Sequence, residues 1–468
     1  MNYTSLWEES KKNSIFPISQ LDPSLADCIV NGDQIFDHYG GKPPFSILAY
    51  QGHHLLVLER LPDGVSVAIR TVINGTGGYG TGILGADVGI LSQTLEDSLF
   101  SAPCANDEFG NFERYRLAKK IKQMIASHTE TSANEWEITF TSTGTEAMDF
   151  AYQIVQLEGF DLSTGVGSRD HRNVIVACRG AWHGWSMAPN QLLDRRQFTE
   201  GLPRFNHHQT VFHQYGDIED LEKIFQTHAG NIRAVFVEGI LGDGGIIPGS
   251  LSWWDRLLSL AEQEGARVVD DEILTCMRTG QFLALPKGKT PDCITLGKGL
   301  GFGIFPISAV AWKKTVLSPR PGIGVRTFNA RPLHSQVVEA GLCYIEEKNL
   351  FSYSLQLGNE LLERLKPLPE LYPDVYKAVR GQGLLIGVEL ANSYGRKGRE
   401  VRDELIRAGL LTELESGLTS VQLPRNKRIN QTIRLTPPLT TPKEAITAIF
   451  TSFEEAANRL SQLRPSYV

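Results

Sequence analysis

The 468-residue chain has few cysteines and lacks several features that mark common classes of protein. Its six cysteines are scattered, with no pair at the spacing of a metal site or a redox dithiol, so we expect reduced thiols in a cytoplasmic protein without a metal ion. No apolar run is long enough to span a bilayer, and residues 1–10 are too polar for a signal peptide. No basic tract stands out and the net charge is −7, which argues against nucleic acid as a partner.

Repeats and low-complexity linkers are also absent from the sequence, and the composition, 41% hydrophobic and 21% charged, is that of an ordinary soluble globular protein. From about residue 137 to 312, short apolar segments alternate with amphipathic ones. This alternation predicts an α/β fold in which helices cover both faces of a mostly parallel sheet. The strands expected here are 137–141, 173–178, 234–237, 267–271, 292–296 and 307–312.

The two ends of the chain follow other patterns. The first hundred residues are rich in glycine, most densely at 74–82, and we expect them to be irregular. After residue 322 the pattern is helical, and it ends in a short apolar segment at 433–439 and a final helix. We expect residues 1–90 to contribute to a smaller α+β domain, residues 91–335 to form the large domain, and residues 336–468 to complete the small one.

Lys298 directly follows a short apolar segment and stands between Gly297 and Gly299. The glycines leave its amine uncrowded, as is required of a lysine that holds an aldehyde cofactor as a Schiff base. The plainer alternative is a solvated lysine in a glycine-rich turn. This segment by itself leaves both interpretations open.

Thr143, Gly144 and Thr145 open a segment with helical periodicity, immediately after the first expected strand. Free N–H groups and the positive end of a helix dipole suit a phosphate group. Either threonine can instead be a simple N-cap. The spacing of a nucleotide-binding P-loop is absent, including at Lys298.

Two further segments follow expected strands. In Trp182-His183-Gly184, the indole can stack on a flat heterocycle, or it can pack in the core beside a surface histidine. Asp270 and Asp271 end another strand, where a carboxylate can hold a protonated pyridine nitrogen or can be a solvated charge. Because neighbouring strand residues point in opposite directions, only one of the two aspartates is expected to face a cofactor.

Seven motifs follow one another along the chain: Thr143-Gly144-Thr145-Glu146-Ala147, Trp182-His183-Gly184, Val237-Glu238-Gly239, Gly242-Asp243-Gly244-Gly245, Asp271-Glu272-Ile273, Thr295-Leu296-Gly297-Lys298 and Ile433-Arg434-Leu435-Thr436-Pro437-Pro438-Leu439. Taken together and in this order, they resemble the motifs of class III aminotransferases, which are enzymes of fold type I that use pyridoxal 5'-phosphate (PLP). The resemblance runs from about residue 135 to the C-terminus and implies a large domain with a seven-stranded type of sheet.

The resemblance implies a role for each matching residue. Lys298 would form the Schiff base and move the proton at the substrate carbon, and Asp271 would pair with the pyridine nitrogen. A threonine that reaches the phosphate from the neighbouring subunit would make the protein a homodimer with shared active sites. The cofactor-binding residues would be Gly144, Thr145, Trp182, Asp271, Lys298 and Thr327.

The resemblance also implies that Arg434 grips a substrate carboxylate, unless it is a structural arginine before the Pro-Pro turn. Asp243 stands where many relatives that use glutamate have a glutamate that masks this arginine. Leu274 replaces a glutamine that bonds the ring hydroxyl of the cofactor. The compact segment around Arg278 is nearer to the glutamate-1-semialdehyde aminomutase branch of the family.

These observations predict a PLP-dependent aminotransferase that moves an amino group from an amino-acid donor, with L-glutamate as the default, to a small aldehyde or keto acceptor. The main alternative is an aminomutase of the glutamate-1-semialdehyde type, or a racemase or decarboxylase, because the cofactor permits all of these reactions. A non-catalytic relative is the third alternative, but it would not need both Lys298 and Asp271.

Overall fold

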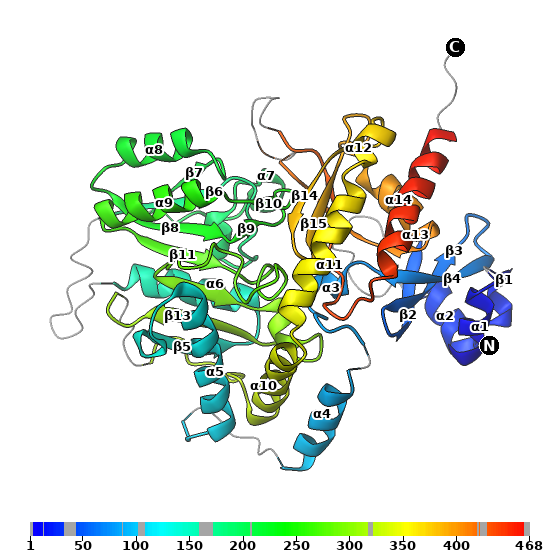
Figure 1. The fold of residues 1–468 in the computed structure, drawn as a ribbon, viewed down its shortest axis with the longest axis horizontal. Coiled ribbons are helices and arrows are strands. Elements are labelled where there is room, and N and C mark those ends of the chain that lie inside the picture. Colours follow the sequence, from blue (N-terminus) through cyan, green and yellow to red (C-terminus); the bar gives the residue numbers. More distant parts are fainter. Residues whose placement is uncertain are drawn as a thin grey trace.

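A computed structural model describes residues 3–12, 14–31, 44–86, 88–101, 108–158, 172–205, 208–316, 322–418, 421 and 428–462. In Figure 1, a large sheet with its helices lies on one side, a sheet from the N-terminal residues lies on the other, and a C-terminal sheet lies between them. Among the described residues, no helix has both the length and the apolar character needed to cross a bilayer.

The large sheet has seven strands in the order β5-β13-β12-β11-β8-β6-β7. All its pairings are parallel except those of β13, which runs antiparallel to both neighbours, so the expected mostly parallel sheet is confirmed. The strands are β5 (Trp136–Thr141), β6 (Val174–Cys178), β7 (Gln209–His213), β8 (Ile232–Glu238), β11 (Arg267–Asp271), β12 (Cys293–Leu296) and β13 (Ser308–Lys313). The sequence pattern missed only β7, an edge strand whose residues are mostly half-buried.

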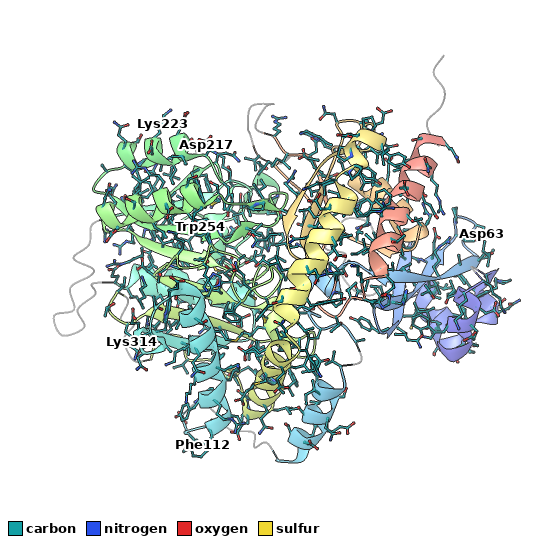
Figure 2. All side chains as sticks on the ribbon, viewed as in Figure 1. Asp63, Phe112, Asp217, Lys223, Trp254 and Lys314 are labelled. Carbon is teal, nitrogen blue, oxygen red and sulfur yellow. The ribbon has the colours of Figure 1, made fainter. Side chains whose placement is uncertain are left out.

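Helices cover both faces of this sheet. Alternate residues of β6 belong to different apolar clusters: Val174 and Val176 pack in one, Ile175 and Ala177 in the other. Such burial on both faces is typical of parallel sheets. Trp254 lies in the first cluster, and Figure 2 shows it inside the molecule. The helices around the sheet are α5 (Phe112–Thr129), α6 (Gly144–Gln156), α8 (Ile218–Thr227), α9 (Leu251–Glu264) and α10 (Pro332–Glu347).

The expectation that the first hundred residues are irregular is wrong. Three antiparallel strands, β2 (Phe45–Gln51), β3 (His54–Arg60) and β4 (Ser66–Asn74), form a sheet that β1 (Ile15–Pro17) joins at one edge. Alternating apolar residues of β3 and β4 pack against α1 (Tyr3–Ser10) and its surroundings, which is a strand signal that the glycine content had obscured.

Both ends of the chain meet in this part of the molecule, because β16 (Leu410–Leu411) pairs in parallel with β4. The other C-terminal sheet has the order β14-β15-β18-β17, and the expected apolar segment near residue 433 is β18. Its strands are β14 (Tyr376–Gln382), β15 (Leu385–Leu390), β17 (Glu413–Glu415) and β18 (Thr432–Leu435). The domain boundaries at residues 90 and 335 stay a prediction.

The remaining elements connect or cover these sheets. They are α2 (Pro23–Asn31), α3 (Gly77–Gly80), α4 (Gly89–Ser101), α7 (Arg196–Thr199), β9 (Ile240–Leu241), β10 (Ile247–Pro248), α11 (Leu350–Leu365), α12 (Leu368–Leu371), α13 (Gly398–Arg407) and α14 (Ala445–Gln462).

Candidate active site

The predicted catalytic residues meet at the carboxyl edge of the large sheet. In the parallel ladder, Asp271 at the end of β11 lies beside Glu238 on β8 and Thr295 on β12. Lys298 follows β12 by two residues and begins a short 3₁₀-helix, Lys298–Gly301. Ligands of α/β sheets bind at this edge, so the topology alone marks it as the candidate site.

Lys298 is half-buried and has a left-handed backbone conformation, with φ of 43°. This conformation is uncommon outside glycine and asparagine. Burial and the nearby positive charge of Arg434 lower the pKa of its amine. A lowered pKa increases the fraction of the neutral amine, which is the nucleophilic form.

The carboxylate of Asp271 is held in a defined orientation. Its Oδ1 accepts hydrogen bonds from the Ile273 N–H at 3.0 Å and from the Thr295 hydroxyl at 3.3 Å, and its Oδ2 lies 2.8 Å from Nδ1 of His183. An ionised carboxylate has further lone pairs, so it can also accept from a protonated pyridine nitrogen. Asp270, on the opposite face of β11, is fully buried and has the acid Glu272 as its neighbour.

His183 lies inside the protein, so the interpretation of a surface histidine is wrong. Burial by itself lowers the pKa of His183, but the hydrogen bond to Asp271 and its charge outweigh burial, and the pKa is raised. Its buried Nε2 has no partner within the described part of the chain. His183 therefore positions Asp271 and stabilises its negative charge, a role that sequence reasoning had missed.

The helix α6 begins at Gly144. Its first residues combine the two features expected of this segment, an N-cap and free N–H groups that suit a phosphate. Thr143 is the N-cap, since its hydroxyl accepts from the Glu146 N–H at 3.2 Å, and Glu146 completes a capping box. The cap leaves the N–H groups of Gly144 and Thr145 at the helix start, where they can hold a phosphate. A Cβ at residue 144 would lie 2.8 Å from Ile273, so only glycine fits there.

Gly184 brings the Trp182 segment against this helix start. A Cβ at residue 184 would lie 2.6 Å from the Thr145 hydroxyl oxygen, and its φ of +101° disfavours any other residue. The substitution Gly184→Ala should therefore push Thr145 out of position while the sheet stays intact. We expect PLP affinity to fall at least about ten-fold, measured by equilibrium dialysis, with little change in far-ultraviolet circular dichroism. The control Gly201→Ala, at a glycine with a similarly positive φ of +80° but open space around it, should leave the affinity unchanged, and equal affinities of both variants would refute this role.

Trp182 is half-buried, and its ring meets Phe198 edge-on at 5.3 Å and Trp185 at 6.0 Å. The backbone N–H of Trp182 donates to Oε1 of Glu238 at 2.9 Å, and the other oxygen of Glu238 accepts from the backbone N–H of Gly242 at 2.8 Å. Burial raises the pKa of Glu238 to about 7. Glu238 therefore fixes two loops of the site at once, although its motif had suggested no specific role.

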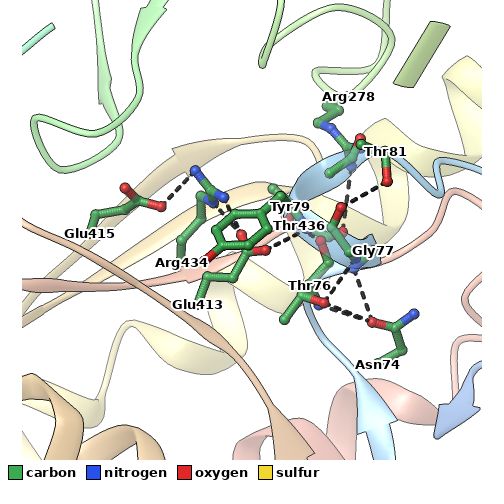
Figure 3. Close-up of polar contacts among 12 residues, drawn as sticks. Asn74, Thr76, Gly77, Tyr79, Thr81, Arg278, Glu413, Glu415, Arg434 and Thr436 are labelled. Atoms are coloured by element: carbon green, nitrogen blue, oxygen red, sulfur yellow. Dashed lines mark hydrogen bonds and ion pairs between the residues drawn. The ribbon is translucent and has the colours of Figure 1, made fainter. Parts of the chain in front are cut away.

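Arg434 is buried and bound by two carboxylates, as Figure 3 shows. Its Nε donates to Oε2 of Glu413 at 2.8 Å, its Nη2 contacts the same oxygen, and its Nη1 lies 2.6 Å from Oε1 of Glu415. Glu413 stands opposite Arg434 in the β17–β18 ladder, and Glu415 shares its face of β17 because side chains alternate along a strand. Sequence reasoning missed both glutamates.

Asp243 does not contact Arg434 directly; it forms an ion pair with the buried Arg195. Burial alone would raise the pKa of Asp243, but the charge of Arg195 outweighs it and the pKa is lowered. The charges of Arg434 and Lys298 act in the same direction, which places Asp243 in the same electrostatic environment. Leu274 is buried, and a Cβ at residue 242 would lie 2.5 Å from it, so the Leu274 side chain packs against Gly242.

Thr327 is exposed within the single chain, between Val325 (72% exposed) and Phe328 (53% exposed). The carbonyl of Phe328 accepts from the Ser142 hydroxyl at 3.3 Å, so this segment runs beside the start of α6. Its reach to the phosphate of a partner subunit stays a prediction.

These residues fit PLP. A lysine with a lowered pKa, an oriented carboxylate, a half-buried indole and a helix start that Gly184 approaches closely surround one edge of the sheet. The fold and the site define a PLP-dependent enzyme of fold type I.

Comparison with known proteins names the family. Residues 70–457 match the family model Aminotransferase class-III, so the chain belongs to the class III aminotransferases, which use PLP. The ornithine aminotransferase of an Exiguobacterium species is 32% identical over 377 residues, which cover 78% of this chain and 83% of the relative. That of Bacillus subtilis is 31% identical over 363 residues, which cover 76% of this chain and 80% of the relative.

Solved structures agree on the fold. The ornithine aminotransferase of Toxoplasma gondii superimposes with a TM-score of 0.77 at 22% identity, covering 95% of this chain and 97% of that one. An amine transaminase from an uncultivated Pseudomonas species gives a TM-score of 0.75 at 19% identity, covering 91% of this chain and 99% of that one. The protein is a PLP-dependent aminotransferase.

Proposed function

We propose that this aminotransferase takes its amino group from a donor that places no carboxylate on Arg434. Ornithine is the first candidate, reacting through its terminal amine with its carboxylate away from Arg434. The observation that carries the proposal is the state of Arg434, whose guanidinium is already bound by Glu413 and Glu415. A donor carboxylate would have to displace one of these buried acids, whereas a cationic or uncharged group would not. The names of the relatives from Exiguobacterium and Bacillus subtilis support ornithine.

The residues of the chain divide the work as follows. PLP, when bound, supplies an electron sink for bond breaking at the substrate carbon. Lys298 provides the amine that binds the cofactor's aldehyde and then holds and moves the proton at that carbon, while Asp271 keeps a positive charge on the pyridine nitrogen. Gly144 and Thr145 bind the phosphate of PLP, and the indole of Trp182 packs against the PLP ring and restricts where it can lie.

The proposal is tested by half-reactions of the PLP-loaded enzyme, followed by visible absorbance under anaerobic conditions. With ornithine alone, we expect the absorbance band of the enzyme to bleach at least about ten-fold faster than with L-glutamate at the same concentration, because glutamate must compete for Arg434. With ornithine and 2-oxoglutarate together, glutamate should accumulate. Equal or faster bleaching by glutamate would favour glutamate as the first donor and reject the proposal.

A separate assay tests the aminomutase alternative, to which the compact segment around Arg278 points. An aminomutase moves the amino group within one carbon skeleton, so it needs no keto acid and releases none. The relatives reported above are named aminotransferases, which favours transfer between two molecules. Turnover of glutamate-1-semialdehyde without any 2-oxoglutarate would favour the aminomutase.

We also propose a cytoplasmic homodimer in which Thr327 of each subunit serves the other's phosphate site. The exposed apolar side chains of Val325 and Phe328 beside Thr327 support a covered surface here. The free cysteines 28, 178, 276, 293 and 343 support a reducing compartment. Light scattering of the purified protein measures the assembly, and a monomer that retains full activity would reject the shared site.

A further inference from the structure

A second buried acid, Glu238, lies beside the pair formed by His183 and Asp271. Glu238 ends β8 and Asp271 ends β11, and the two residues are partners in the parallel ladder, so their side chains lie on the same face of the sheet. The imidazole of His183 lies over this face too, because its centroid is 6.5 Å from that of Phe236 on β8 and its Nδ1 is 2.8 Å from Asp271. Glu238, His183 and Asp271 thus form one buried cluster.

The hydrogen bonds of Glu238 suit a negative charge. Its Oε1 accepts from the backbone N–H of Trp182 and its Oε2 from that of Gly242, so both oxygens are acceptors. N–H donors stabilise a carboxylate relative to the protonated acid. Because Trp182 directly precedes His183, the same acid also holds the backbone that carries the imidazole.

The charges of the three groups are linked. Burial by itself lowers the pKa of His183, but the hydrogen bond to Asp271 and the negative charges of Asp271 and Glu238 outweigh burial and raise it. Burial raises the pKa of Glu238 to about 7, while the positive charge of His183 opposes this rise and the charge of Asp271 adds to it. Near pH 7, Glu238 is therefore close to the midpoint of its titration and responds to any charge added to the cluster.

The other groups on which the charge of Glu238 acts supply no positive charge, within the described part of the chain. They are Cys178 on β6, Tyr215 after β7 and Asp270 on the opposite face of β11. Burial raises the pKa of the Cys178 thiol and of the Tyr215 phenol well above their usual ranges, so both stay neutral near pH 7. The charge of Asp271 acts in addition on Glu272 and on the amine of Lys298. His183 is therefore the cation that Glu238 faces.

The charge balance of the cluster changes when Asp271 holds a protonated ring nitrogen, and the inference rests on this part of the proposed function. The nitrogen adds a second positive charge close to His183, and a buried site does not tolerate two cations with a single anion. We propose that Glu238 is a positioning residue that supplies the second negative charge, so that His183 and the ring nitrogen stay protonated at the same time. Glu238 acts on the nitrogen through His183 and Asp271.

The test titrates the His183 imidazole of the PLP-loaded protein by nuclear magnetic resonance. Glu238→Gln removes the negative charge, so the pKa of His183 should fall by about one unit. Glu238→Asp keeps the charge and should restore most of this fall. Asp270→Asn removes another buried acid on which Glu238 acts, but one outside the cluster, and should leave the pKa of His183 unchanged.

The affinity for PLP gives a second measurement with a definite sign. Because the bound, protonated nitrogen favours ionised Glu238, ionisation of Glu238 strengthens binding as pH rises through about 7. Equilibrium dialysis should therefore show that Glu238→Gln costs at least about three-fold more affinity at pH 8 than at pH 6. The titrations of PLP itself are common to both proteins and cancel in this ratio.

An unchanged pKa of His183 in Glu238→Gln would overturn the proposal. So would an equal fall in Glu238→Asp, because the contacts of the side chain rather than its charge would then be responsible. If Glu238→Gln does not fold, the unmodified protein still decides: ionisation of Glu238 should add a second inflection below about pH 7 to the titration of His183, and a single inflection would overturn the proposal. Failure of ornithine as the donor is distinguishable, since it shows as absence of amino transfer and leaves the titration of His183 unaffected.

Discussion

Replacing Lys298 with alanine is expected to lower amino-group transfer at least about 10³-fold while the protein stays folded. The amine follows β12 at the carboxyl edge of the sheet, and burial together with the charge of Arg434 lowers its pKa. Without it, neither the bond to the cofactor's aldehyde nor proton movement at the substrate carbon can occur efficiently. Steady-state turnover with ornithine and 2-oxoglutarate measures the loss.

Two controls make this result specific to Lys298. Lys223→Ala removes an equally charged side chain from the surface helix α8, which Figure 2 places far from the sheet edge, and should leave turnover unchanged. Added methylamine should restore part of the activity of Lys298→Ala, because a free amine can take over the proton transfer. Turnover close to that of the unmodified protein would show that another group is the catalytic amine.

Replacing Asp271 with asparagine is expected to lower turnover at least about 10²-fold and to weaken cofactor binding. The neutral amide cannot keep a proton on the pyridine nitrogen, so the electron sink is lost even though the shape of the site is preserved. The charge of Asp271 and its hydrogen bond also raise the pKa of His183, which should fall in the variant. Turnover, equilibrium dialysis with PLP and titration of the His183 imidazole by nuclear magnetic resonance measure the three effects.

Asp270→Asn is the matched control, because Asp270 is adjacent in sequence but lies on the opposite face of β11. Burial and the charge of Glu272 raise the pKa of Asp270 well above its usual range, so its folded form already resembles a neutral amide. The folded state binds this proton more tightly than the unfolded state, so the contribution of Asp270 to stability falls as pH rises above about 3.9. Asp270→Asn should remove this decrease of stability with pH and keep turnover within about ten-fold of the unmodified protein. A loss of turnover equal to that of Asp271→Asn would show that Asp270, not Asp271, pairs with the pyridine nitrogen.

Much of the large sheet and the position of Lys298 could be predicted from the sequence. Strands such as β11 and β12 are short apolar runs bounded by polar or glycine residues, and their order along the chain implies a parallel sheet. Once the sheet is parallel, residues that follow its strands must gather at one edge, which is why Asp271 and Lys298 could be placed together. Local sequence patterns are sufficient for these predictions, because strand positions and the residues that follow each strand depend on neighbours in the sequence.

The environment of Arg434 could not be predicted in this way. Glu413 and Glu415 are ordinary alternating residues of a short strand, and nothing in their segment indicates that β17 pairs with β18. The bond from the Tyr79 N–H to Glu413 joins residues 334 positions apart. The role of His183 could not be predicted either, because only the fold brings its ring within hydrogen-bond distance of Asp271.

By itself, the sequence determined the α/β architecture, because that follows from local periodicity. It also determined which polar residues follow each strand, and therefore which residue types are available for PLP chemistry. Only the tertiary structure decided which charges face one another: His183 with Asp271, Arg195 with Asp243, and Arg434 with two glutamates. The physical reason is that ion pairing in a buried site depends on distances of a few ångströms between segments far apart in the chain, and strand pairing rather than sequence order sets those distances.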